Sequence, residues 1–329
     1  MADKTLIYLG AEASGLYRKE AADSSWEQLS DGMPPSPQAR AIAIHPENPD
    51  LVFVGTQRGV YRSQDRGDHW QRMNLSEGRI VWSLKFQPGN PRIMYLGTEG
   101  SEVYQSQDGG ENWEYLSTIS NPDSVQMAFA TRILGIGIDS TNPDYMYAAL
   151  EVGGAARSIN AGKTWQLVNR EFAGDVDRMD LHGVAVAAED SSAVFISNRT
   201  GIWRSGDQGE NWENLHIERF SDIKYSRGVQ VAPDNPNVLY ACVGMNFGSE
   251  EGGVMRTTDL GETWHRFDQG VTPKSTTFGV ASNNQNPEQV YFCTRRGQVF
   301  GTHDGGSTWE EHSVPEAATN VISVACSTA

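Results

Sequence analysis

The segment GVYRSQDRGDHW, residues 59–70, places a serine, two aspartates and a histidine within eight positions. Catalytic and metal-binding motifs often have such a composition. Its pattern Ser/Thr-x-Asp-x-Gly-x-x-Trp recurs, however, with copies that begin at Ser63, Ser106, Ser158, Ser205, Thr257 and Thr302, and Asn160 replaces the aspartate in one of them. A catalytic motif has no reason to occur six times in one chain. The pattern therefore indicates a structural scaffold.

A seventh, degraded copy near the N-terminus keeps the tryptophan, Trp26, and the preceding aromatic-arginine pair, Tyr17-Arg18. The seven box tryptophans, from Trp26 to Trp309, follow one another at intervals of 43 to 52 residues. Near-equal units of this length that tile a whole chain predict a repeat architecture.

Each unit also contains short runs in which apolar residues alternate. Arg40-Ala-Ile-Ala-Ile44 is followed by an Asn-Pro turn and then by Leu51-Val-Phe-Val-Gly55. Period-two alternation, β-branched residues and Asn-Pro or Gly punctuation are typical of strands. Four strands in each of seven units predict an all-β fold, a seven-bladed β-propeller that spans residues 1–329 as a single domain.

The two ends of the chain predict how this ring closes. Residues 5–9 and 15–18 have the pattern of second and third strands, whereas residues 320–325 have the pattern of an inner strand. We therefore expect the C-terminal strand to complete the N-terminal blade, which removes the open edges that a sheet would otherwise expose.

The repeated box fits the hairpin between the third and fourth strands of a blade. Its aspartate can accept hydrogen bonds from nearby backbone N–H groups in an Asx-type turn. Its glycine can adopt the positive φ that such a turn needs, and its tryptophan can bury its ring between blades. We therefore assign the box, with His69 and His303, to the scaffold.

These residues resemble the Asp-box (BNR) repeat of sialidases, xyloglucanases, sortilin-type receptors and photosystem II assembly factors. The resemblance covers the whole chain and implies the propeller fold. It implies little about function, because this fold hosts unrelated activities. The Phe/Tyr-Arg-Ile-Pro segment of sialidases is missing near the N-terminus, which argues against a true sialidase.

Composition limits the partners that we expect. The formal net charge of −16 argues against nucleic acid or an anionic membrane surface. Neither the three cysteines nor the seven histidines have ligand spacing, so we expect no metal and no cofactor. The N-terminal residues lack the pattern of a signal peptide and no apolar run reaches membrane-spanning length, which predicts a cytoplasmic protein.

We expect a functional site at the face away from the boxes, where the inner strands begin, by analogy with related propellers. Aligning the inner strands gives one mouth residue per blade: Arg40, Trp82, Leu134, His182, Arg227, Phe278 and Asn320. Two arginines, a histidine, an asparagine and a tryptophan depart from an otherwise apolar pattern. The mouth of the channel is therefore predicted to be polar.

Loops on the same face add further charged residues. The cations include Arg79, Arg132, Arg178 and Arg295, and the acids include Glu12, Glu99, Glu151 and Asp177. Guanidinium groups pair with carboxylate, sulfate or phosphate, which predicts an anionic small molecule or a saccharide acid as ligand. The alternative is that these arginines are balanced by the local acids.

His182 is the strongest catalytic candidate, because it follows the acidic loop at residues 171–181. A histidine beside carboxylates and arginines can act as a general base, with Tyr225 as a partner acid and Asp177 nearby. The alternative is a hydrogen-bonded channel histidine without a catalytic role.

Two classes of function therefore remain open. The first is an enzyme, of lyase or hydrolase type, that acts on an anionic or sugar-acid substrate. A glycosidase would need two facing carboxylates, for which Glu12, Glu99, Glu151 and Asp177 are candidates. The second is a non-catalytic module that docks a protein partner, as photosystem II assembly factors do. The long loops at 119–133, 171–181, 217–226 and 245–253 are expected to wall the mouth and set specificity.

Overall fold

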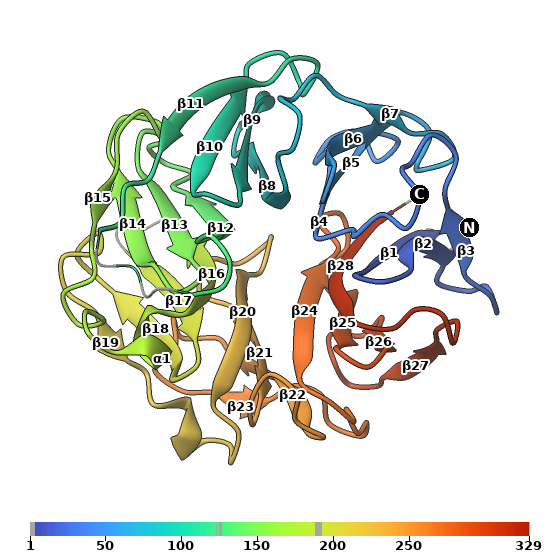
Figure 1. The fold of residues 1–329 in the computed structure, drawn as a ribbon. Helices are drawn as coiled ribbons and strands as arrows, with labels where there is room; N and C mark the ends of the chain where they lie inside the picture. The colour runs from blue at the N-terminus through green and yellow to red at the C-terminus, as the bar shows by residue number, and fades with distance from the viewer. Residues whose placement is uncertain (1–3, 123, 125–126, 188–192, 329) are drawn as a thin grey trace.

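A computed structural model describes residues 4–122, 124, 127–187 and 193–328. Its strands form seven four-stranded antiparallel sheets that stand around a common axis like blades (Figure 1). This arrangement confirms the seven-bladed β-propeller. Neither of the two helices in the described residues, α1 (Val176–Met179) and η1 (Ile217–Arg219), has the length and apolarity needed to cross a bilayer.

The strand bounds follow the repeat. The first blade has β1 (Thr5–Ala11), β2 (Gly15–Glu20), β3 (Glu27–Leu29) and β28 (Val321–Thr328), and the second has β4 (Ala41–Ile44), β5 (Val52–Thr56), β6 (Gly59–Ser63) and β7 (Gln71–Arg72). The third has β8 (Val81–Gln87), β9 (Asn90–Thr98), β10 (Glu102–Ser106) and β11 (Glu114–Thr118), and the fourth has β12 (Ile133–Ile138), β13 (Met146–Leu150), β14 (Gly154–Ser158) and β15 (Gln166–Leu167). The fifth has β16 (Leu181–Val186), β17 (Val194–Asn198), β18 (Gly201–Ser205) and β19 (Glu213–Asn214), and the sixth has β20 (Tyr225–Val231), β21 (Leu239–Gly244), β22 (Gly252–Thr257) and β23 (His265–Arg266). The seventh has β24 (Thr277–Ser282), β25 (Val290–Thr294), β26 (Gln298–Thr302) and β27 (Glu310–Ser313).

The ring closes between the two ends of the chain. β28 pairs antiparallel with β1, with Thr5 opposite Thr328 and Leu9 opposite Val324, so the C-terminal strand is the inner strand of the first blade. This is the closure that the sequence predicts. Because seven inner strands then surround the axis, every blade packs against two neighbours.

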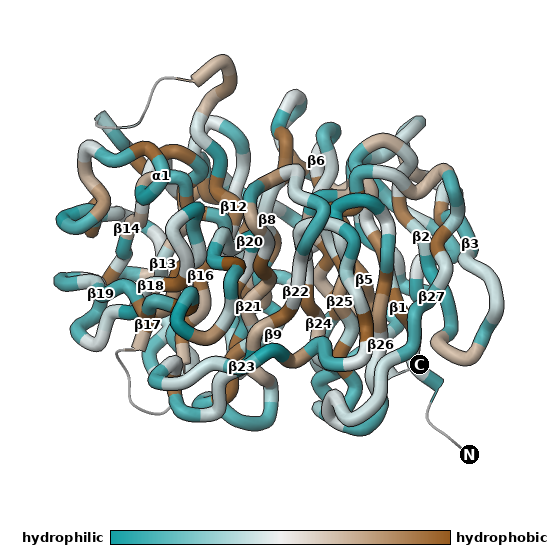
Figure 2. Tube along the Cα trace, turned by 90° about the horizontal axis from the view of Figure 1, so that it is seen from below, coloured by the Kyte–Doolittle hydropathy of each residue, from teal (hydrophilic) through white to brown (hydrophobic). Residues whose placement is uncertain are grey.

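The two faces of the ring are built from different connections. Because the strands of a blade are antiparallel, the turns from first to second strand and from third to fourth strand lie on one face, which we call the box face. The inner strands begin on the opposite face, which we call the mouth face. α1, which precedes β16, marks the mouth face at the upper edge of Figure 2. That figure also shows hydrophobic segments along the strands and hydrophilic segments in many loops.

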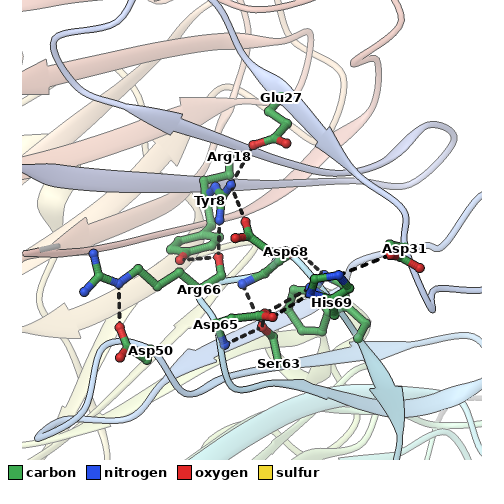
Figure 3. Close-up of polar contacts among 12 residues, drawn as sticks. Tyr8, Arg18, Glu27, Asp31, Asp50, Ser63, Asp65, Arg66, Asp68 and His69 are labelled. Atoms are coloured by element: carbon green, nitrogen blue, oxygen red, sulfur yellow. Dashed lines mark hydrogen bonds and ion pairs between the residues drawn. The ribbon is translucent and has the colours of Figure 1, made fainter.

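The Asp box forms the same turn wherever the structure describes it. In the first complete copy, Ser63 Oγ donates to Asp65 Oδ1 at 2.7 Å and accepts from the N–H of Gly67 at 2.7 Å (Figure 3). Asp65 Oδ1 also accepts from the N–H of His69 at 2.9 Å. Gly67 has a φ of 106°, which only glycine adopts without strain. Trp70 donates its indole N–H to the carbonyl of Gly67 and is buried.

Arginines of four third strands connect a box to the preceding blade. Arg18 on β2 donates to the carbonyl oxygen of Arg66 at 2.9 Å and pairs with Asp68 at 2.7 Å (Figure 3). The same contact, an arginine that reaches into the next box, is made by Arg62, Arg157 and Arg204 with Glu111, Glu210 and Glu262. We call Arg18, Arg62, Arg157 and Arg204 the bridging arginines. They add a polar contact to the apolar core between blades.

Candidate binding pocket at the channel mouth

The inner strands carry a β-bulge at the mouth face. The pairing register skips one residue between Val81 and Ser83, and equivalent skips occur in β12, β16, β20, β24 and β28. A bulge bends the strand and re-aims the side chain of the unpaired residue. The unpaired residues are Trp82, Leu134, His182, Arg227, Phe278 and Ile322, and Arg40 precedes β4 at the equivalent position.

These seven residues line one cavity at the mouth of the channel, with a volume of about 860 Å³. We call it the mouth cavity. Its size suits a small molecule or a short peptide segment. Six of these seven residues, all except Ile322, are those that the alignment of the inner strands selects.

The seventh mouth residue differs from the expectation. Asn320 is exposed and does not line the mouth cavity, whereas Ile322 does. Asn320 has a φ of 55° and ends the preceding turn, where its carbonyl oxygen accepts from the N–H of Glu12. The inner strand therefore begins one residue later than the pattern suggests, and the bulge moves the inward-facing position by another residue.

A stack of aromatic rings and guanidinium groups forms one wall of the cavity. The guanidinium carbons of Arg40 and Arg132 lie 3.9 and 4.3 Å from the ring centroid of Trp82, and that of Arg132 lies 3.9 Å from the ring centroid of Phe129. Burial lowers the pKa of Arg40, and the charge of Arg132 contributes in the same direction. Such stacking keeps the guanidinium planes in fixed positions.

This wall contains buried N–H groups without a hydrogen-bond acceptor among the described residues. They are Nε and Nη1 of Arg40, Nε of Arg132 and Nε1 of Trp82. The side chain of Arg40 is only 9% exposed, although Arg40 Nη1 lies 3.5 Å from Glu12 Oε1. Unsatisfied buried donors cost free energy, so a ligand with acceptor atoms would be stabilised at this wall.

Each of the four carboxylates among the described lining residues of the mouth cavity forms an ion pair with a lining arginine. Glu12 lies 2.9 Å from Arg295, and Glu151 lies 2.9 Å from Arg132. Arg199 pairs with both remaining acids, Asp177 at 3.1 Å and Asp180 at 2.6 Å. Although burial opposes it, Arg295 and Arg40 lower the pKa of Glu12. The local ion pairs that the sequence left open as an alternative are therefore present.

Arg227 differs from the other lining arginines. It forms no ion pair with any acid in the described part of the chain. Its guanidinium carbon lies 4.7 Å from the ring centroid of Phe278 and 5.6 Å from that of Phe247. The described lining residues include five arginines, namely Arg40, Arg132, Arg199, Arg227 and Arg295, and four carboxylates. Among these residues the arginines outnumber the carboxylates by one, and Arg227 is the arginine without an acidic partner.

His182 is buried, with no exposed side-chain surface. Its Nδ1 lies 2.6 Å from the carbonyl oxygen of Ser226, and its Nε2 lies 3.3 Å from Asp180 Oδ2. Two acceptors favour the protonated ring, but burial lowers the pKa of His182 and the charge of Arg227 adds to that effect. Each ring nitrogen already has an acceptor of the protein within reach, the carbonyl of Ser226 for Nδ1 and Asp180 for Nε2. Nε2 faces Asp180, so it is badly placed to take a proton from a ligand.

Tyr225 and Asp180 belong to the same cluster. The ring centroids of Tyr225 and His182 are 5.3 Å apart, and burial raises the pKa of Tyr225 despite the nearby charge of Arg227. Although burial alone would raise it, the hydrogen bonds and charges of His182 and Arg199 lower the pKa of Asp180 to about 2. In its burial this cluster resembles a structural hydrogen-bond network, although Asp180 Oδ1 has no hydrogen-bond partner among the described residues.

Three other sequence candidates lie outside the lining. Arg79 pairs with Glu102 at 2.7 Å, and Arg178 pairs with Asp175 at 3.2 Å beside α1. Glu99 does not line the cavity and lies 3.9 Å from Arg132. Their side chains make these contacts on the mouth face without entering the cavity.

Apolar residues of two long loops complete the rim. Met127 and Phe129 precede β12, and Met245 and Phe247 follow β21. Met127, Met245 and Phe247 remain exposed although they are large and hydrophobic. The sequence indicates that these loops wall the mouth, but not which of their side chains reach it. Exposed apolar side chains beside a cavity are a feature of binding surfaces.

The fold and the site together define a class of protein, an Asp-box propeller with an arginine-rich and aromatic mouth cavity. A family model described as photosynthesis system II assembly factor YCF48 matches residues 8–328, so the chain belongs to this family.

Individual relatives have two kinds of name. The chain is 25% identical over 323 residues to the xyloglucanase Xgh74A of Acetivibrio thermocellus, which covers 83% of this chain and 38% of that protein. It is 24% identical over 294 residues to the photosystem II assembly lipoprotein Ycf48 of Trichormus variabilis, covering 84% and 75%. A solved structure named YCF48 bound to D1 peptide has a TM-score of 0.55 at 17% identity, covering 94% and 84%. The chain thus spans less than half of the length of the xyloglucanase.

Proposed function

We propose that this chain is a non-catalytic binding module whose mouth cavity takes a carboxylate-bearing segment of a partner protein. The observation that carries this proposal is the pairing with lining arginines of each of the four carboxylates in the described part of the lining. General acid or base catalysis needs a titratable group that reaches the substrate with a suitable pKa. Glu12 and Asp180 instead have lowered pKa values, and His182 is buried behind its own hydrogen bonds.

The remaining donors suit an acceptor-rich ligand. Arg227 is without an acidic partner among the described residues, and Arg40 has two buried N–H groups without an acceptor. Carboxylates accept such charge-assisted hydrogen bonds, often in a bidentate arrangement. Phe247 and Phe278 offer apolar surface beside Arg227, so an apolar side chain next to the carboxylate would also find contacts.

Membership of the family supports a protein ligand. One relative is described as a photosystem II assembly lipoprotein, and another was solved with a peptide of D1. The first name refers to assembly of photosystem II, and the second to a bound peptide. The shared fold and the polar mouth make a peptide segment the ligand class that we favour.

A pair of short fluorescein-labelled peptides tests this proposal. One peptide has glutamates flanking a leucine, and its counterpart has glutamines at the same places. We expect the acidic peptide alone to bind, and Arg227→Ala to weaken that binding roughly 10- to 100-fold, the range for loss of a charged hydrogen bond. Arg58→Ala is the matched control, because Arg58 is exposed on the mouth face and does not line the cavity. Equal binding of the two peptides, or equal effects of the two substitutions, would contradict the proposal.

The xyloglucanase relatives favour a second candidate, hydrolysis of a saccharide. Incubation with xyloglucan and measurement of new reducing ends tests it. A retaining or inverting hydrolase depends on two carboxyl groups, so Asp177→Asn and Glu151→Gln should each abolish any activity. Sustained turnover that these substitutions remove would replace the binding module by an enzyme.

A further inference from the structure

A second cavity lies on the box face, at the opposite end of the channel from the mouth cavity. It has a volume of about 710 Å³ and is lined by the second halves of inner strands and by the turns that follow them. We call it the box-face cavity. Its wall is mainly aliphatic, with Ile42, Ile44, Leu84, Ile138, Val184, Val186, Val229 and Val231 among the lining residues.

One lysine breaks this apolar wall. Lys85 lies on β8, opposite Tyr95 on β9, and lines the box-face cavity. The register identifies its counterparts, because in every blade the equivalent residue stands opposite a tyrosine or phenylalanine of the second strand. These counterparts are Ala43, Gly137, Ala185, Gln230, Ala281 and Ala325. Lys85 is the charged member of a ring that otherwise contains alanine, glycine and one glutamine.

Lys85 is a cation that the channel leaves accessible. Its side chain is exposed, while the protein around it partly desolvates the ammonium group and lowers its pKa. No carboxylate of the described residues forms an ion pair with it. The one acid among the described lining residues is Asp234, in the turn after β20. The ammonium group is therefore an accessible cation in an otherwise apolar wall, at a position where four other blades carry alanine.

We propose that the box-face cavity is a second ligand site, for a small molecule that joins a carboxylate to an apolar chain. The Lys85 amine would pair with the carboxylate, and the aliphatic walls of β4, β16 and β20 would contact the chain. The ligand carboxylate would thereby give Lys85 a charged partner, and burial of the chain would displace water from apolar surface. Because the site lies at the other end of the channel, it is separate from the peptide site proposed above.

Calorimetric titration with sodium octanoate tests this site on the whole protein. Lys85→Met keeps length and apolar volume but removes the charge, and we expect it to bind octanoate about tenfold more weakly or worse, as for a lost charged contact. Arg58→Ala, which removes an exposed arginine that lines neither cavity, should bind octanoate as the unaltered protein does. Acetate and octan-1-ol, which each keep one half of the ligand, should both bind more weakly than octanoate.

Several results would overturn the proposal. These are no binding of octanoate by the unaltered protein, equal affinity in Lys85→Met, or octan-1-ol binding as tightly as octanoate. Loss of octanoate binding in Arg227→Ala but not in Lys85→Met would place the carboxylate in the mouth cavity instead. If Lys85→Met does not fold, Lys85→Ala repeats the test with the residue that β4, β16, β24 and β28 carry at this position.

Discussion

A single side chain explains why the first box looks catalytic. The box aspartate accepts from the residue four positions later, through that residue's backbone N–H and, in most copies, its side chain. In the first box the side-chain donor is His69, whose Nδ1 lies 2.7 Å from Asp65 Oδ2. Asn112, Asn211, Thr263 and Thr308 make the same contact in other boxes. His69 is therefore one of several donors that satisfy the same carboxylate.

This role predicts the effect of Asp108→Ala. The substitution removes acceptors for the Asn112 backbone and side-chain N–H groups, at 2.9 and 2.7 Å, and for the Ser106 hydroxyl. We expect a loss of roughly 1–3 kcal/mol in the free energy of unfolding, measured by urea denaturation. Glu114→Ala, an exposed strand position nearby, serves as control. Peptide binding by folded Asp108→Ala should be unchanged, and its loss would contradict the scaffold assignment.

Asp180 predicts how stability responds to acid. Its pKa is lowered from 3.8 to about 2 in the folded protein. A depressed carboxyl pKa contributes stability that is present above the unfolded value and is lost as the pH falls through the folded value. The loss therefore falls between about pH 4 and pH 2, and it amounts to roughly 2 kcal/mol for this group. Asp180→Asn should melt lower at neutral pH and change less over this interval. An unaltered acid slope would show that the charged form of Asp180 is not stabilised in the folded protein.

At the scale of elements, the bridging arginines follow a rule between neighbouring blades. Where the third strand carries Arg18, Arg62, Arg157 or Arg204, the next box has an acid three residues after its aspartate position. β10 instead carries Gln105, which donates to the Tyr95 hydroxyl, and the next box carries Lys163. An acid at position 163 would have no arginine to pair with, because Gln105 stands at the position of the bridging arginine.

The missing bridge can be introduced. Gln105→Arg together with Lys163→Glu should form an ion pair between the third and fourth blades. We expect a favourable coupling energy of about 0.5–1 kcal/mol in a double-mutant cycle at low salt, the range for partly exposed pairs. Gln105→Arg alone should destabilise, because it faces Lys163 and leaves the Tyr95 hydroxyl without its donor. Additive effects of the two substitutions would exclude a bridge at this interface.

Strand phase made the inner elements predictable. Arg227 and Phe278 each begin an alternating run before an Asn-Pro turn, so their phase can be read directly. At the C-terminal strand no such turn follows, and the alignment selected Asn320 instead of Ile322. The bulge itself has no sequence signal, because its geometry depends on pairing with the second strand.

Contacts between distant segments were not predictable in the same way. Glu12 and Arg295 are 283 residues apart, yet they pair at 2.9 Å because ring closure brings the first and last blades together. The burial of His182 likewise depends on Ser226, which belongs to the next blade. The sequence could therefore name the charged residues of the mouth face, but could not decide between free and paired arginines.

At the scale of the whole molecule, the closed ring separates the two cavities and supports both. Removing residues 318–329 deletes β28, which leaves β1 as an unpaired edge beside the axis and breaks the packing of the first blade against β24. We expect a large loss of stability and a tendency to aggregate, measured by thermal melting and light scattering, since an open edge can pair with other chains.

A synthetic peptide of residues 318–329 should restore the melting temperature of the truncated protein, because it can re-form the pairs from Thr5–Thr328 to Ala11–Val321. A peptide with Val324 and Cys326 changed to lysine is the matched control, because both face the apolar contacts of the first blade. A truncated protein that melts like the full chain would mean that the ring is closed by contacts other than β28.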